Sequence, residues 1–313
     1  MSEPTQPEVT EPGLLHCYRH PDRETGVTCA RCERPICPQC MTPASVGFQC
    51  PECVAEGRKS IRPTRTIFGG RAGGNGEITK ALIAVNVAIY LITALNAGSL
   101  FNPDPSASVY SDFALRPAFV AHGEWWRLLS AMFLHYNLFH IAFNMWALLV
   151  MGIPLEAMLG RLRFSVVYLL SGLGGSVLSF ALGPTFESAA GASGAIFGLF
   201  GAFFIILRRR NLETGGIVGI IVVNLLFSFA FSGIDWRGHV GGLIVGVLIG
   251  GAIAYAPTGA MRDRLQGLGA GAIALLLLAA GFAASAHVRH ECRTNPDPQV
   301  LSSCFQAGFT STP

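Results

Sequence analysis

The stretch Gly191-Ala192-Ser193-Gly194-Ala195-Ile196-Phe197-Gly198 places one serine among small residues, inside an uncharged run that extends from 188 to 207. A run of this length and composition is typical of a membrane-spanning helix. The Ser193 hydroxyl is therefore expected at membrane depth, where polar side chains are costly and by default functional. This stretch predicts a membrane fold built around a serine.

The composition of the whole chain agrees with a membrane protein. Only 13% of its 313 residues are charged and 51% are hydrophobic, whereas about 25% are charged in an average soluble domain. Apolar runs that are long enough to cross a bilayer, or nearly so, recur seven times. They lie at 78–97, 133–153, 164–182, 189–207, 215–231, 236–255 and 265–286.

The placement of charges predicts the topology. Residues 1–15 are polar and rich in Pro and Glu, which predicts a disordered leader and no signal peptide. With a cytoplasmic amino terminus, the loops on the cytoplasmic side carry arginines at 161–163, 208–210 and 262–264, and the opposite loops carry few. The positive-inside rule then favours a multi-pass protein of the cell membrane with an external carboxyl terminus.

The amino-terminal region holds four pairs of metal-ligand residues with a gap of two residues in each pair. The pairs are Cys17/His20, Cys29/Cys32, Cys37/Cys40 and Cys50/Cys53. Eight such ligands suit two tetrahedral zinc ions, and in so short a segment the metal must supply folding free energy. The alternative is a disulfide cluster, which a cytoplasmic location and an odd number of cysteines disfavour. The spacing alone leaves open whether sequential or alternate pairs share an ion.

The spacing over residues 16–55 resembles a B-box-type zinc finger. That resemblance implies cross-bracing, in which alternate pairs share an ion. Cys17, His20, Cys37 and Cys40 would then bind one zinc, and Cys29, Cys32, Cys50 and Cys53 the other. Because protein side chains fill every ligand position, we expect a structural module that binds a cytoplasmic protein partner.

Two further segments flank the predicted spans. Residues 56–77 are basic and glycine-rich, which predicts a flexible linker that orients the chain and contacts anionic lipid, with no nucleic-acid partner expected. Residues 287–313 form the predicted external tail. On that side disulfides persist, so a bridge between Cys292 and Cys304 is favoured over a free pair.

Four polar residues interrupt the apolar spans: His140, Asn144, Ser193 and His239. Each lies within about two turns of the start of an even-numbered span, a depth of at most roughly 10 Å at 1.5 Å per residue. The predicted topology puts all four in one layer near the external surface. His140 and Asn144 also share one helix face because they are four residues apart.

Glycine pairs are expected to bring the fourth and sixth spans together. Gly194 and Gly198 form one small-residue ridge, and Gly242 and Gly246 form the other. Such ridges let helix backbones approach closely, which would bring Ser193 within hydrogen-bond reach of His239.

These residue types fit acyl transfer. A serine becomes a nucleophile when a base accepts its proton, and histidine is the usual partner. The oxyanion formed on attack needs donors, which His140, Asn144 and the Ser193 backbone N–H can supply. Taken singly, a serine in a glycine-rich helix is usually a packing residue. The convergence of all four on one layer favours chemistry.

The motifs over residues 78–256 resemble those of rhomboid intramembrane serine proteases. They are G-x-S-G at 191–194, H-x-x-G-x-x-x-G at 239–246, H-x-x-x-N at 140–144, Trp126-Arg127, and Glu156 with Gly160. The resemblance implies that Ser193 is the nucleophile, His239 the base, and His140 with Asn144 the oxyanion-hole residues, with no cofactor for catalysis. Phe197 departs from the tyrosine of many relatives. Asp235 is expected in a loop and outside the catalytic set.

The expected fold is thus an all-α polytopic membrane protein. A six-helix rhomboid-like core at 78–256 is followed by a cytoplasmic loop and a seventh span at 257–286, and is preceded by the zinc-binding module. The expected substrates are transmembrane proteins within the lipid bilayer. The alternative function is a catalytically inactive rhomboid-like protein that binds membrane clients. A transporter is disfavoured because no pair of broken spans marks an inverted repeat.

Overall fold

The structure is a computed structural model that describes residues 13–60, 65–71, 75–231 and 233–309. The chain divides into two compact units, residues 1–63 and 64–313. The first twelve residues of the predicted leader lie outside the described residues.

The amino-terminal unit is small and built around sulfur atoms. Its elements are β1 (Leu15–Cys17), β2 (His20–Thr25), the 3-10 turn η1 (Pro38–Cys40), β3 (Thr42–Pro43), β4 (Phe48–Gln49) and α1 (Pro51–Ser60). β1 pairs with β2 and β3 with β4, both antiparallel. Its buried interior consists of cysteine side chains and Ile36. A unit with so small an apolar core would gain folding free energy from a bound metal.

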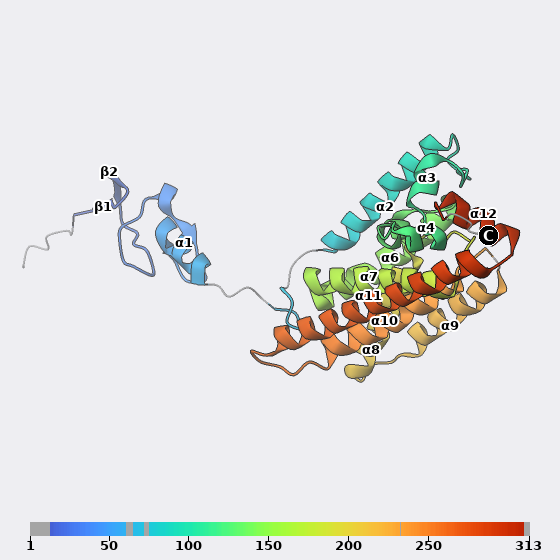
Figure 1. Ribbon diagram of the computed structural model, residues 1–313. Coiled ribbons are helices and arrows are strands. Elements are labelled where there is room, and N and C mark those ends of the chain that lie inside the picture. Colours follow the sequence, from blue (N-terminus) through green and yellow to red (C-terminus); the bar gives the residue numbers. More distant parts are fainter. Residues whose placement is uncertain (1–12, 61–64, 72–74, 232, 310–313) are drawn as a thin grey trace, which may run out of the picture. The chain divides into compact units, whose positions relative to one another are not determined.

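The second unit is a bundle of long helices. They are α2 (Glu77–Asn96), α6 (Leu138–Leu159), α7 (Arg161–Leu182), α8 (Ser193–Arg209), α9 (Gly215–Ala230), α10 (Trp236–Ala254) and α11 (Arg262–Thr294). The centre is formed by α7, α8 and α10, which pack on one another, while α2 packs on α6 and α11 runs along α7 and α10 (Figure 1). Their leucine, isoleucine, valine and aromatic side chains fill a continuous apolar core.

The long connection between α2 and α6 is folded into short helices. These are α3 (Ser108–Phe113), α4 (Pro117–His122), α5 (Arg127–Ser130) and the 3-10 turn η2 (Ala131–Phe133). Arg127 holds them together. Its guanidinium is 3% exposed, donates to the carbonyls of Ser111 and Ala114, and pairs with Glu124. A charge buried this deeply is stable because each of these contacts compensates its desolvation.

Two of the seven predicted spans are shorter than the others. Among the described residues, α2, α6, α7, α10 and α11 are long and apolar enough to cross a membrane, whereas α9 has 16 residues. α8 has 17 residues, which is about 26 Å of helix.

The predicted starts at 133 and 189 were wrong. The helix α6 begins only at Leu138, where the Asn137 side chain accepts a hydrogen bond from His140 N, and α8 begins at Ser193 after Gly191 at φ 137°. Apolar composition extended both predictions into preceding residues that lie outside these two helices.

α8 and α10 approach through the four glycines that the sequence singled out. A Cβ on Gly242 would lie 2.6 Å from the carbonyl carbon of Gly194, and one on Gly246 would lie 2.5 Å from that of Gly198. Neither distance leaves room for a side chain. The glycines therefore set the separation of the two helices that carry Ser193 and His239.

Part of the stretch predicted as a flexible linker is packed. α1 extends to Ser60, and Phe68 is buried in the core of the second unit. The Gln266 side-chain amide donates to the carbonyls of Phe68 and Ile253, and Asp263 pairs with Arg163. Residues 65–71 are thus held against the bundle by Phe68 and by the Arg65–Asp263 pair, although their glycines and arginines predicted a flexible linker.

The carboxyl-terminal residues fold against the bundle. α11 continues to Thr294, past the predicted end at 286, and α12 (Pro298–Gln306) packs on α4. A disulfide joins Cys292 to Cys304, which confirms the expected pairing.

Candidate active site and metal-ligand clusters

A cavity of about 430 Å³ opens between α6, α8 and α10. All four polar residues singled out from the sequence line it, namely His140, Asn144, Ser193 and His239. Each lies near the amino-terminal end of its helix, so the three helices present one layer of polar side chains.

A hydrogen-bond contact in this layer joins α8 to α10. Ser193 Oγ lies 2.7 Å from His239 Nε2. The ring of Phe197, one turn after the serine, stacks on the imidazole of His239 with centroids 4.2 Å apart and planes 12° apart. His239 is 9% exposed, so its ring is held on one face by an aromatic ring and at Nε2 by the serine.

His140 and Asn144 face the cavity from α6. The Tyr136 ring stacks on His140 at 5.6 Å and 19°, and the Tyr136 hydroxyl donates to the carbonyl of Ser188. Asn144 Nδ2 donates to the carbonyl of His140. Since an amide carries two N–H donors, the second one of Asn144 is left for the cavity.

Gly191 allows His140 to approach the serine. A Cβ at this position would lie 2.8 Å from His140 Cε1 and 2.9 Å from Nε2, and φ is 137°, which L side chains rarely adopt. The G-x-S-G motif thus has a physical reason in this chain: its first glycine makes space for an imidazole beside Ser193.

Asp235 does not contact His239 through its side chain. Its carboxylate accepts from the backbone N–H of Arg237, which makes it the amino-terminal cap of α10, and from the hydroxyl of Ser179. It therefore starts the helix that carries His239.

Two residues that contact the cavity histidines were missed in the sequence. Tyr136 orients His140, and Ser228 on α9 contacts His239 Nδ1 at 2.6 Å. Neither carries a sequence signal of its own, because an aromatic residue before a span and a serine within one are both common.

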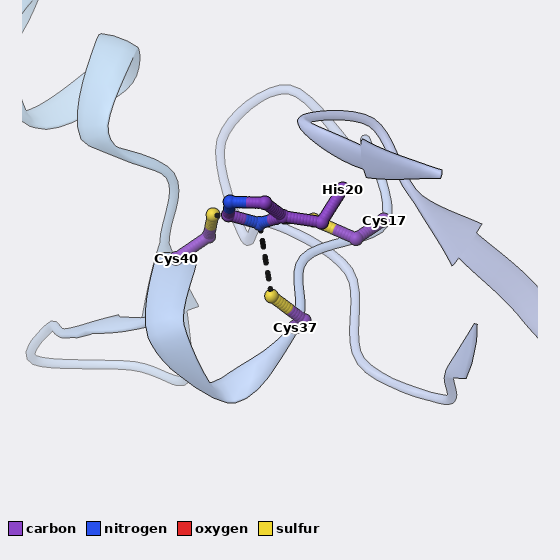
Figure 2. Close-up of side chains that lie close together, drawn as sticks. All are labelled: Cys17, His20, Cys37 and Cys40. Carbon is purple, nitrogen blue, oxygen red and sulfur yellow. Dashed lines mark hydrogen bonds between the residues drawn. The ribbon is translucent and has the colours of Figure 1, made fainter. Parts of the chain in front are cut away.

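The amino-terminal unit holds two clusters of metal ligands. One is Cys17, His20, Cys37 and Cys40, the other Cys29, Cys32, Cys50 and Cys53, and in each the ligand atoms all lie within 4.8 Å of one another. In the first, His20 Nδ1 lies 3.4 Å from the sulfurs of both Cys37 and Cys40 (Figure 2). The structure thus groups alternate pairs, as cross-bracing requires, and not sequential ones.

The chemistry of both clusters fits a divalent cation. Burial and the sulfurs of Cys17 and Cys37 raise the pKa of Cys40 to about 11. Burial is the largest cause that raises the pKa of Cys53 to about 12, and the sulfur of Cys50 is the next. Thiolates packed this closely repel one another, and a Zn²⁺ ion would remove that cost.

Comparisons with known proteins show which family this sequence resembles. Residues 122–256 match the Rhomboid domain family model. The rhomboid protease GluP of Bacillus subtilis is 38% identical over 214 residues, which are 67% of this chain and 40% of GluP. The putative rhomboid protease YdcA of Bacillus subtilis is 38% identical to this chain over 135 residues, which are 42% of this chain and 68% of YdcA. RHOMBOID-like protein 4 of Arabidopsis thaliana is 29% identical over 278 residues, which are 72% of this chain and 69% of the Arabidopsis protein.

The fold and the cavity define a class, namely polytopic helical membrane proteins in which a serine and a histidine face one cavity. The chain belongs to the rhomboid family. It matches less than half the length of GluP.

Proposed function

We propose that this protein is an intramembrane serine protease that hydrolyses peptide bonds in or beside transmembrane segments of other membrane proteins. The observation that carries the proposal is the 2.7 Å contact between Ser193 Oγ and His239 Nε2, in a cavity that His140 and Asn144 also line. Membership of a family whose relatives bear the name rhomboid protease supports the reaction class.

In the proposed reaction, Ser193 Oγ attacks the scissile carbonyl carbon as its proton passes to His239 Nε2. The protonated imidazole then gives that proton to the leaving amine, and the peptide bond breaks to leave an acyl-Ser193 ester. A water molecule, deprotonated by the same nitrogen, hydrolyses the ester. This chemistry needs a serine and a base at hydrogen-bond distance, and no cofactor.

The oxyanion of each tetrahedral intermediate is assigned to three donors. Ser193 is the first residue of α8, and backbone N–H groups in the first turn of a helix have no intrahelical acceptor. The second side-chain N–H of Asn144 and the ring of His140 flank the same space. The helix dipole adds positive potential at this end of α8.

The proposed orientation places this layer near the external face of the membrane, with the amino terminus in the cytoplasm. Water must reach the acyl-enzyme, so a site near one surface suits the reaction. Substrates with small, helix-destabilising residues are favoured, because a fully hydrogen-bonded helix hides its carbonyl carbons. In the same orientation, the amino-terminal unit binds two zinc ions and a cytoplasmic protein partner.

The test is cleavage of single-span substrates by purified protein in liposomes. Wild type and Ser165→Ala should cleave, because Ser165 is an exposed helical serine that only bonds the Arg161 carbonyl. Ser193→Ala and His239→Ala should not. Cleavage by Ser193→Ala at the wild-type rate would refute the assignment. Substrate capture by wild type without cleavage or labelling by a fluorophosphonate probe would instead identify a client-binding protein.

A further inference from the structure

His239 has two ring nitrogens, and each faces a different serine. Nε2 lies 2.7 Å from Ser193 Oγ on α8, and Nδ1 lies 2.6 Å from Ser228 Oγ on α9. Ser228 is 2% exposed. The contact with Nδ1 is therefore shielded from water, where a hydrogen bond has the most influence on ring orientation.

The hydrogen of the Ser228 hydroxyl is already engaged. Ser228 Oγ lies 2.7 Å from the carbonyl of Asn224, one turn earlier on α9. A carbonyl oxygen only accepts, so the hydroxyl must donate to it, and a hydroxyl has one hydrogen. Toward His239, Ser228 Oγ can then only accept.

These two hydrogen bonds of Ser228 fix the tautomer of the neutral His239 imidazole. Nδ1 carries the hydrogen and donates it to Ser228, which leaves the lone pair of Nε2 directed at Ser193. That is the form in which His239 can accept the serine proton. The opposite tautomer would place an N–H against Ser193 and a bare Nδ1 against an oxygen with no free hydrogen.

We propose that Ser228 is a positioning residue that holds His239 in its Nδ1–H tautomer, with Nε2 aimed at Ser193. This inference rests on the proposed Ser193–His239 chemistry. Ser228 takes no proton in the reaction: the proton that leaves Ser193 passes to Nε2 and from there to the leaving amine, while Nδ1 and the Ser228 hydroxyl keep theirs. The Nδ1–H donor is present in both the neutral and the protonated ring, so the contact persists through the cycle.

The arrangement also ties the base to a helix that is otherwise loosely held. Among its described residues, α9 buries only Ile217 and Ser228. Asp235, the nearest carboxylate in the chain sequence, caps α10 and bonds Ser179 instead. A neutral hydroxyl on α9 thus occupies the place beside Nδ1 that a carboxylate takes in a serine protease triad.

The experiment measures kcat and KM for a fluorogenic peptide in detergent micelles, using wild type, Ser228→Ala, Ser228→Cys and Ser228→Thr. Cysteine keeps the side-chain volume but its sulfur is a weak acceptor, whereas threonine keeps the hydroxyl. We expect Ser228→Ala and Ser228→Cys to lose roughly 10- to 100-fold in kcat, as for an unpaired buried donor, with KM changed less than about twofold. Ser228→Thr should recover most of the rate.

Ser165→Ala is the matched control, since its hydroxyl also bonds a carbonyl four residues earlier but lies far along the chain from His239. Thermal unfolding of each variant separates a folding defect from a kinetic one, and Ser228→Cys decides the case if Ser228→Ala does not fold. Full activity of Ser228→Cys, or of Ser228→Ala, would overturn the positioning role while leaving the dyad intact. An inactive wild type that no fluorophosphonate labels would overturn the proposed function, and this inference with it.

Discussion

At the residue scale, Phe197 is predicted to act on the rate through its ring. Its stacking on His239 at 4.2 Å is worth about 0.5–1.5 kcal/mol beyond burial. Phe197→Leu should therefore lower kcat about 2- to 12-fold. Phe204→Leu, on the same helix and outside the cavity lining, should leave kcat unchanged. Equal rates for the two variants would show that the stacking has no kinetic role.

Some residues of the candidate active site could be predicted from the sequence, and others could not. Four residues could be recognised because polar side chains are rare within membrane spans. They are His140, Asn144, Ser193 and His239. Ser228 does not stand out, because a serine that bonds its own helix is compatible with a membrane span. Its contact with His239 depends on the packing of α9 against α10, which no local pattern encodes.

At the element scale, the spacing of α8 and α10 is predicted to be limited by glycine. Gly242→Ala would put a methyl group 2.6 Å from the Gly194 carbonyl carbon, forcing the helices apart at a cost of about 1–3 kcal/mol. Since Ser193 and His239 lie on these helices, cleavage should fall with stability. Gly251→Ala, on α10 with no atom within 4 Å of its Cβ, should be neutral or slightly stabilising. Thermal unfolding in detergent and substrate cleavage distinguish them.

Unchanged unfolding temperature and cleavage for Gly242→Ala would contradict the close packing of α8 on α10. The sequence predicted this contact because glycine at a spacing of four residues is a strong local pattern. It did not predict where α6 and α8 begin, because Asn137 and the positive φ of Gly191 act at single residues inside apolar runs.

The start of α2 is held by a buried carboxylate on α6. Glu156 is 1% exposed and accepts from the backbone N–H groups of Ile78 and Thr79 and from the Thr79 hydroxyl. Glu156→Gln replaces one acceptor oxygen by a donor, and should destabilise the bundle by about 1–3 kcal/mol. Glu77→Gln removes an exposed pair with Arg161 and should cost no more than about 1 kcal/mol. Equal unfolding temperatures would disprove the capping role.

At the scale of the whole molecule, the chain combines two units with different sources of stability. Residues 64–313 bury a large apolar core, whereas the core of residues 1–63 is almost entirely cysteine. Ligand spacing predicted the eight residues of the two clusters, because a two-residue gap lets both side chains of a pair turn toward one ion. The grouping of alternate pairs followed only from the resemblance to a B-box-type zinc finger. The packing of Phe68 in the second unit was not predictable, since it depends on Gln266, far away in sequence.

Metal removal should therefore act on one unit alone. Purified full-length protein is expected to hold two zinc ions, and a strong chelator should make residues 13–60 sensitive to added protease while cleavage of a membrane substrate continues. Because the raised pKa values of Cys40 and Cys53 keep those thiols protonated near neutral pH without metal, zinc binding must release protons, and affinity should fall as pH falls. Calorimetry in buffers of different ionisation enthalpy measures that release. Loss of substrate cleavage on chelation, reversed by zinc, would show instead that the two units are coupled.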